Sequence, residues 1–250
     1  MTVQMKRRVL IIQNPGTIKE PLDGVKVDVR EMRGYLHSLA GGAWENDEIT
    51  ILPPDTEVES IRDFFNANNR DVQYYLIYFT GHGSYSESSG SKYWLANDTV
   101  FTLDNLKDWV NDIPTLFIND CCQGVEPLNE SVAERKLFSI TGDANEREKY
   151  RNAYNDIIRR LSKGSFCVAS AASLDEEAGE SSVKGGYYTS ALLSQAKHLF
   201  TNPEINPGVY MITCIHSLAA SQVEERTNGS QIPEISGYTR TWAPPFMVKL

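Results

Sequence analysis

Short apolar runs alternate along the chain with segments whose apolar positions recur at helical spacing. The runs are rich in Val, Ile, Phe and Tyr and are bounded by polar residues, Gly or Pro, a pattern typical of strands. We expect strands at residues 8–13, 48–52, 72–79, 115–119, 166–170 and 246–250. We expect helices at residues 25–39, 58–65, 147–162, 187–200 and 207–226. Alternation of this kind predicts an α/β domain on a largely parallel sheet.

Composition narrows the class of protein. The 250 residues, 41% of them apolar, suffice for one sizeable core, so we expect a single domain. The net charge of −9 and the scattered Lys and Arg residues argue against a nucleic-acid surface. With no apolar run near 18 residues and no signal-peptide pattern, we expect no membrane association and a cytoplasmic location. Four cysteines, two of them adjacent, do not form a disulfide framework.

The candidate chemistry lies where two of the expected strands end. His82, between two glycines, follows one strand, and Cys121 and Cys122 follow another. Ligands of open parallel sheets bind beyond the carboxyl ends of the strands, and a thiol needs a nearby base or cation to react as thiolate. Taken singly, these residues are more often a loop histidine and small buried thiols. Their paired placement favours a cysteine hydrolase.

Five segments, in the same order along the chain, carry a family resemblance. They read LDGVKVDVREMRGYL from residue 22, YYLIYFTGHGS from 74, PTLFINDCCQG from 114, GYYTSALL from 186 and SQIPEISGYTRTWAPPFMV from 230. Together they resemble the caspase-like cysteine peptidases of clan CD, peptidase family C14, which include metacaspases and paracaspases. We expect a prokaryotic type. The resemblance implies a three-layer αβα sandwich with a mostly parallel six-stranded sheet.

The resemblance also implies catalytic roles. His82 and a cysteine would form the dyad, and the backbone N–H groups of Gly83 and Cys122 would hold the oxyanion. Counting back from Gly124 in the metacaspase form selects Cys121 as nucleophile. The caspase form, and counting forward from Pro114, select Cys122, which we favour.

Specificity within the family depends on the charge of the pocket for the P1 residue. Asp28, Thr80 and, with Cys122 as nucleophile, Asp120 match metacaspase pocket positions, which implies cleavage after Arg or Lys. Two carboxylates in one pocket would select a cation by charge and paired hydrogen bonds. The alternative is that Asp28 is a solvated helix residue and Asp120 a turn former.

The remaining expectations concern organisation, partners and alternative functions. Within the single domain 1–250 we expect a large-subunit-like region at residues 1–124, a linker at 125–163 and a small-subunit-like region at 164–250. The linker offers basic residues for self-cleavage: Arg135, Lys136, Arg147, Lys149, Arg151, Arg159, Arg160 and Lys163. We expect protein or peptide substrates, any activator as a separate chain, no nucleic acid and no cofactor; calcium has no dedicated Asp-rich loop. The alternatives are an inactive caspase-like scaffold, a peptidase with a non-basic P1 preference, a metal site and a nucleotide-binding domain.

Overall fold

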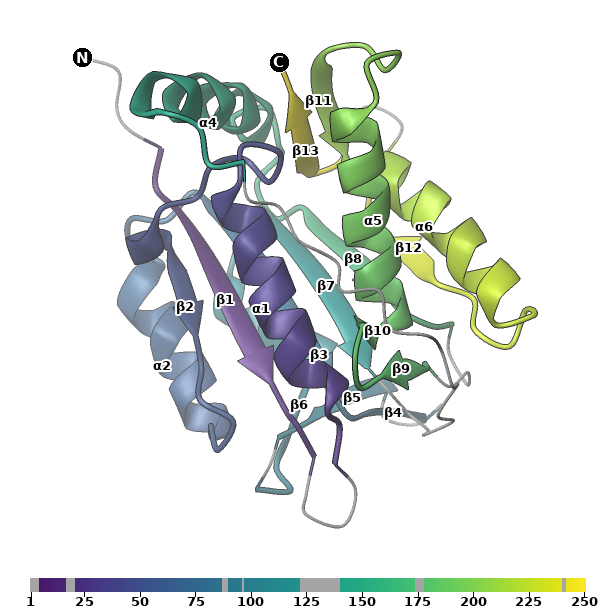
Figure 1. The fold of residues 1–250 in the computed structure, drawn as a ribbon. Coiled ribbons are helices and arrows are strands. Elements are labelled where there is room, and N and C mark those ends of the chain that lie inside the picture. The colour runs from purple at the N-terminus through teal and green to yellow at the C-terminus, as the bar shows by residue number, and fades with distance from the viewer. Residues whose placement is uncertain are drawn as a thin grey trace.

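A mostly parallel six-stranded sheet forms the centre of the computed structural model, which describes residues 5–16, 21–86, 90–95, 97–121, 140–173, 178–239 and 242–250. The strand order is β12-β8-β7-β3-β1-β2, and β12 alone is antiparallel to its neighbour (Figure 1). Its strands are β1 Arg7–Gln13, β2 Ile49–Ile51, β3 Tyr74–Gly81, β7 Thr115–Cys121, β8 Phe166–Ser170 and β12 Glu234–Ser236. The mostly parallel six-stranded sheet is confirmed.

Helices cover both faces of this sheet. The helices are α1 Gly24–His37, α2 Val58–Asn68, α3 Leu103–Val110, α4 Ala144–Ile158, α5 Tyr187–Thr201 and α6 Ile212–Arg226. Helices α1, α4, α5 and α6 contribute to one core cluster and α2 and α3 to the other, so α1 and α2 lie on opposite sides of the sheet (Figure 1). All eight residues of β3 are buried, as expected for a central strand covered on both faces. The three-layer αβα arrangement follows.

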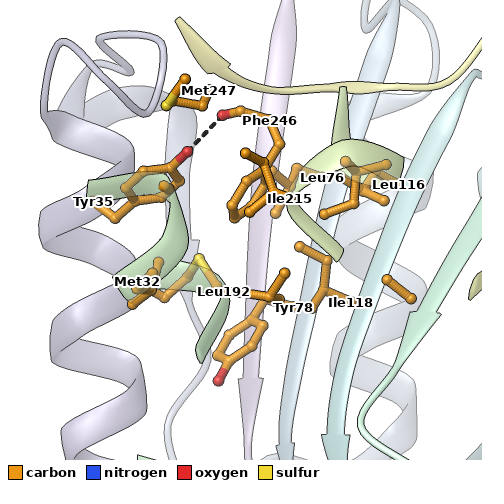
Figure 2. Packing of buried hydrophobic residues seen from close by; sticks show 14 of the residues in the cluster. Met32, Tyr35, Leu76, Tyr78, Leu116, Ile118, Leu192, Ile215, Phe246 and Met247 are labelled. Carbon is orange, nitrogen blue, oxygen red and sulfur yellow. Dashed lines mark hydrogen bonds between the residues drawn. The ribbon is translucent and has the colours of Figure 1, made fainter. Parts of the chain in front are cut away.

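The larger core joins segments that are far apart in the chain. Met32 and Tyr35 of α1 pack with Leu76 and Tyr78 of β3, Leu192 of α5 and Ile215 of α6 (Figure 2). The Tyr35 hydroxyl donates a 2.7 Å hydrogen bond to the carbonyl of Phe246, so the end of the chain is tied to the first helix. This packing fixes α1 and α5 over the carboxyl half of β3.

Small antiparallel sheets complete the fold. They consist of β4 Gly83–Ser86, β5 Gly90–Trp94 and β6 Val100–Thr102; of β9 Glu180–Ser181 and β10 Gly185–Gly186; and of β11 Gly208–Met211 and β13 Pro245–Lys249. None of the described helices combines the length and the apolar character that crossing a bilayer requires.

Two expected elements differ from the structure at the end of the chain. The apolar run at residues 246–250 forms a strand, but β13 pairs with β11 instead of joining the central sheet. The sixth place in that sheet belongs to β12, an edge strand whose short sequence Glu-Ile-Ser contains no apolar run and leaves its two polar residues exposed. The expected helix 207–226 begins only at Ile212, since residues 208–211 form the partner strand of β13.

Candidate active site

Strands β3 and β7 end side by side at the carboxyl edge of the sheet. In their parallel register Thr80 lies opposite Asp120, and Gly81 lies opposite Cys121. His82 is the next residue after β3. Cys122, the favoured nucleophile and second expected oxyanion donor, and Gly124 lie outside the described residues. The structure therefore places the expected histidine and the first cysteine of the pair at one edge of the sheet.

The backbone around His82 is held by the small sheet that follows. The carbonyl of His82 accepts a 3.0 Å hydrogen bond from the N–H of Trp94, and Gly83 pairs with Tyr93 across the β4–β5 ladder. The side chain of His82 is half-buried. A base at this position is thus carried on a fixed backbone and keeps access to solvent.

Cys121 packs beneath Gly83. A Cβ atom built on Gly83 would lie 2.7 Å from Cβ and 2.9 Å from Sγ of Cys121, so this approach requires glycine. The Cys121 thiol donates a 3.6 Å hydrogen bond to Oδ1 of Asn119, and its side chain packs against the core cluster under α2 and α3. The residue is half-buried, and desolvation, followed by the charge of Asp120, raises the pKa of the Cys121 thiol well above its usual range. These surroundings suit a structural thiol better than a nucleophile.

Asp28 lies on the inner face of α1 and faces β3. It is 1% exposed, within a stripe of otherwise largely apolar buried positions. Its Oδ2 accepts a 3.0 Å hydrogen bond from the Thr80 hydroxyl, and the N–H of Gly186 donates to both of its oxygens at 3.0 Å. Asp28 is therefore a buried acceptor that joins α1, β3 and β10, which differs from the solvated helix residue considered above.

Asp120 comes to the same place from β7. It is fully buried, and its Oδ2 accepts a 2.8 Å hydrogen bond from the N–H of Thr189 in the first turn of α5. Its Oδ1 has no hydrogen-bond partner among the residues that the structure describes. Burial, and then the charges of Asp28 and Asp120, raise the pKa of Tyr78 well above its usual range, and the Tyr78 hydroxyl lies 2.7 Å from the hydroxyl of Thr189, the residue whose N–H binds Asp120.

The Gly185–Gly186 segment covers the two carboxylates. A Cβ atom on Gly185 would lie 1.9 Å from Oδ1 of Asp28, and one on Gly186 would lie 2.2 Å from Oδ2 of Asp120. Gly185 also has φ +76°, a conformation that favours glycine. Figure 1 shows β10 beside the carboxyl end of β7. Asp28, Thr80 and Asp120 thus form one buried acidic site, and two glycines form its cover.

Gln231 anchors the backbone just before β9, the strand that pairs with the Gly185–Gly186 segment. The sequence did not reveal this role. Its side-chain Nε2 donates a 2.8 Å hydrogen bond to the carbonyl of Ala171, and its Oε1 accepts a 3.0 Å hydrogen bond from the N–H of Gly179. Gln231 is 1% exposed. It joins the residue after β8 to the residue before β9. The only sequence signal was its place in the segment that begins at residue 230.

The described residues contain no group of three or more His, Cys, Asp or Glu side chains arranged to hold a metal ion. The buried carboxylates form a pair, and one of them is occupied by backbone and hydroxyl donors. Chemically, the site offers two buried carboxylates at the edge of the sheet where β3 leads into His82.

Asp120 should make stability depend on pH. Burial raises its pKa from an ordinary 3.8 to about 6, although hydrogen bonds from Thr189 act in the opposite direction. A carboxyl whose pKa is higher in the folded chain favours folding when protonated, so the free energy of unfolding falls as pH rises through this range, by at most roughly 3 kcal/mol. We expect the Tm of Asp120→Asn relative to wild type to increase from about pH 4.5 to about pH 7.5. Thermal unfolding of both proteins across this range measures the difference; a difference independent of pH would contradict the expectation.

Comparison with known proteins identifies the family. The caspase domain model of peptidase family C14 matches residues 6–241. Caspase-1 from Spodoptera frugiperda is a solved structure similar to this chain, with a TM-score of 0.59 and 15% identity over 93% of this chain and 86% of that one. At this identity the likeness concerns the fold. No curated protein sequence gives a significant match. Since the family model spans nearly the whole chain, the protein belongs to the caspase domain family of cysteine peptidases.

Proposed function

We propose that the protein is a cysteine endopeptidase that uses Cys122 as nucleophile and His82 as acid–base. The observation that carries this proposal is the common end of β3 and β7. The last pair in register is Gly81 with Cys121, and His82 and Cys122 are the residues that follow in the two strands. The surroundings of Cys121 support the choice, because its thiol packs under Gly83 and burial raises its pKa.

The proposed reaction proceeds through a thioester. The Cys122 thiolate attacks the carbonyl carbon of the scissile peptide bond, and His82 gives a proton to the leaving amine. The backbone N–H groups of Gly83 and Cys122 hold the oxyanion. Water then attacks the thioester, His82 takes its proton, and the carboxylate product leaves with the thiol restored. The half-buried position of His82 on a backbone fixed by β5 supports its role.

We propose further that the peptidase cleaves after Arg or Lys. Support comes from Asp28 and Asp120, which approach the same buried site from α1 and β7 beside the expected dyad. Negative charge held in a low-dielectric site attracts a guanidinium or ammonium group and rejects a P1 aspartate. Protein or peptide chains are therefore the proposed partners.

A panel of fluorogenic peptides that differ only at P1 tests this function. We expect cleavage after Arg and Lys to exceed cleavage after Asp and Leu by at least about 100-fold in kcat/KM, because like charge and a desolvated carboxylate each oppose the wrong side chain. The measurement is kcat/KM for the four peptides, with and without calcium. Fast cleavage after Asp or Leu together with none after Arg would favour the non-basic alternative. Absence of cleavage in all four would favour an inactive scaffold.

A further inference from the structure

The two carboxylates of the buried acidic site differ in how they are hydrogen-bonded. Both are almost fully excluded from solvent, at 1% for Asp28 and 0% for Asp120. Both lie against the Gly185–Gly186 segment. The two carboxylates differ, however, in how many of their oxygens are engaged by hydrogen-bond donors.

Asp28 is engaged through both oxygens. The N–H of Gly186 donates to Oδ1 and to Oδ2, and the hydroxyl of Thr80 donates to Oδ2. These donors come from β10 and β3, two elements that both pack against α1. Donors in this number compensate much of the cost of burying a carboxylate. Asp28 therefore links α1, β3 and β10 through hydrogen bonds.

Asp120 is engaged through one oxygen. Thr189 at the start of α5 binds Oδ2, whereas Oδ1 has no partner within the described residues. An ionised, buried and half-satisfied carboxylate is unfavourable in the folded protein, and a cation that binds Oδ1 would remove this cost. Gly186 adjoins both Asp120 oxygens, since a Cβ atom there would lie 2.2 Å from Oδ2 and 2.7 Å from Oδ1. Because Asp120 is fully buried, its surroundings must shift before a substrate cation can reach it.

We propose that the two acidic residues divide the work of specificity: Asp120 binds the substrate cation, and Asp28 is a positioning residue that holds Gly186 and Thr80 around it. This inference rests on the proposed preference for Arg or Lys. The charge that distinguishes a basic P1 side chain then resides on Asp120 alone. Asp28 affects every substrate alike, because it sets the shape of the site.

Matched peptides with Arg or citrulline at P1 test this division, because citrulline keeps the shape of Arg without its charge. The quantity measured is the ratio of kcat/KM for the two peptides. We expect Asp120→Asn to lower this ratio about 10- to 100-fold, the range for a hydrogen bond to a charged group. We expect Asp28→Asn to leave the ratio within about 3-fold and to lower kcat/KM for both peptides by a common factor. The amide introduced by Asp28→Asn keeps an acceptor for the Gly186 N–H, so Asp28→Ala should lower both rates further.

The outcomes separate the two proposals. A wild-type ratio near one would reject the preference for Arg or Lys itself. A clear wild-type ratio that falls as much in Asp28→Asn as in Asp120→Asn, or that survives Asp120→Asn, would reject only the division of roles. Thermal unfolding at neutral pH gives a second measurement that needs no activity. Asp28→Asn should lower the Tm by about 2–4 °C or more, and Asp120→Asn should leave it unchanged or raise it; the opposite order would overturn the division.

Discussion

Replacing Cys122 or His82 by Ala should lower kcat for peptide cleavage by at least about 10³-fold, whereas Cys121→Ala should retain most of the activity. This is the largest effect that we expect from any substitution. Removing the nucleophile eliminates the thioester route, and removing the histidine leaves the thiol protonated and the leaving amine without a proton donor. Because the two act as a unit, the double variant Cys122→Ala/His82→Ala should be scarcely less active than either single variant.

The adjacent cysteine provides the matched control. Cys121 and Cys122 have the same chemistry, but the thiol of Cys121 packs under Gly83 and donates to Asn119. Since burial raises its pKa, we expect Cys121 to react with iodoacetamide much more slowly than Cys122 in the folded protein. The measurements are kcat/KM with a P1-Arg peptide and alkylation of each cysteine followed by peptide mapping. Activity that survives in Cys122→Ala and disappears in Cys121→Ala would reverse the assignment.

Most of the central sheet could be predicted because its strands are buried on both faces. β3 and β7 are continuous apolar runs that end in polar or small residues, so their positions could be predicted to within two residues: the expected strands 72–79 and 115–119 are Tyr74–Gly81 and Thr115–Cys121. β12 could not be predicted from the sequence. Its residues Glu234–Ser236 belong to an edge strand, where pairing with β8 rather than side-chain burial fixes the conformation. β11 was read as the start of a helix because its strand state depends on β13, 37 residues after it, counting from Gly208 to Pro245.

The composition of the candidate site was legible in part. Family motifs indicated Asp28, Thr80 and Asp120, and the structure brings all three together. The sequence does not show that Asp28 and Asp120 differ in their hydrogen bonds. That difference depends on where the N–H groups of Gly186 and Thr189 point once α5 has packed. The role of Gln231 could not be predicted for the same reason: its hydrogen-bond partners, Ala171 and Gly179, come near it only in the folded chain.

A second buried charge cluster lies at the opposite end of the sheet, at the amino end of β1. Arg7 is 1% exposed; it donates to Glu48 at 3.4 Å, to Asn155 at 3.0 Å and to the carbonyl of Gly42 at 2.8 Å, and its guanidinium lies 4.0 Å from the centre of the Trp44 ring. Glu48 also accepts hydrogen bonds from both terminal nitrogens of Arg151, one at 2.6 Å. The cluster thus joins β1 to α4, which Figure 1 shows at this end of the sheet.

This arrangement bears on the proposed self-cleavage sites between residues 125 and 163. Residues 144–158 form α4, and within it Arg147 donates to the carbonyls of His37 and Trp44. Arg151 is tied to Glu48. Peptidases bind extended chains, so neither arginine is presented for cleavage while α4 is docked. Arg135 and Lys136 lie outside the described residues.

Glu48→Gln should produce the largest loss of stability among the substitutions considered. Burial alone would raise the pKa of Glu48, but the hydrogen bond from Arg151 and the charge of Arg7 outweigh it and lower the pKa, so the side chain is ionised at neutral pH. Gln at this position leaves two buried or half-buried guanidinium groups without their shared anion. Breaking a buried pair in this way costs about 3–5 kcal/mol, or about 6–20 °C in Tm for a domain of this size. Chemical and thermal unfolding measure the loss.

An exposed ion pair and a double substitution provide the controls. Lys6 and Asp71 form a 3.0 Å pair whose side chains are 60% and 70% exposed, so Asp71→Asn should change the free energy of unfolding by less than about 1 kcal/mol. Glu48→Gln combined with Arg151→Gln should cost less than the sum of the two single variants, because the second change removes one of the cations that the first leaves unpaired. Additive losses would mean that Glu48 and Arg151 stabilise the protein independently. Their coupling, in contrast, would show that charge, and not apolar contact alone, holds α4 to the segment just before β2.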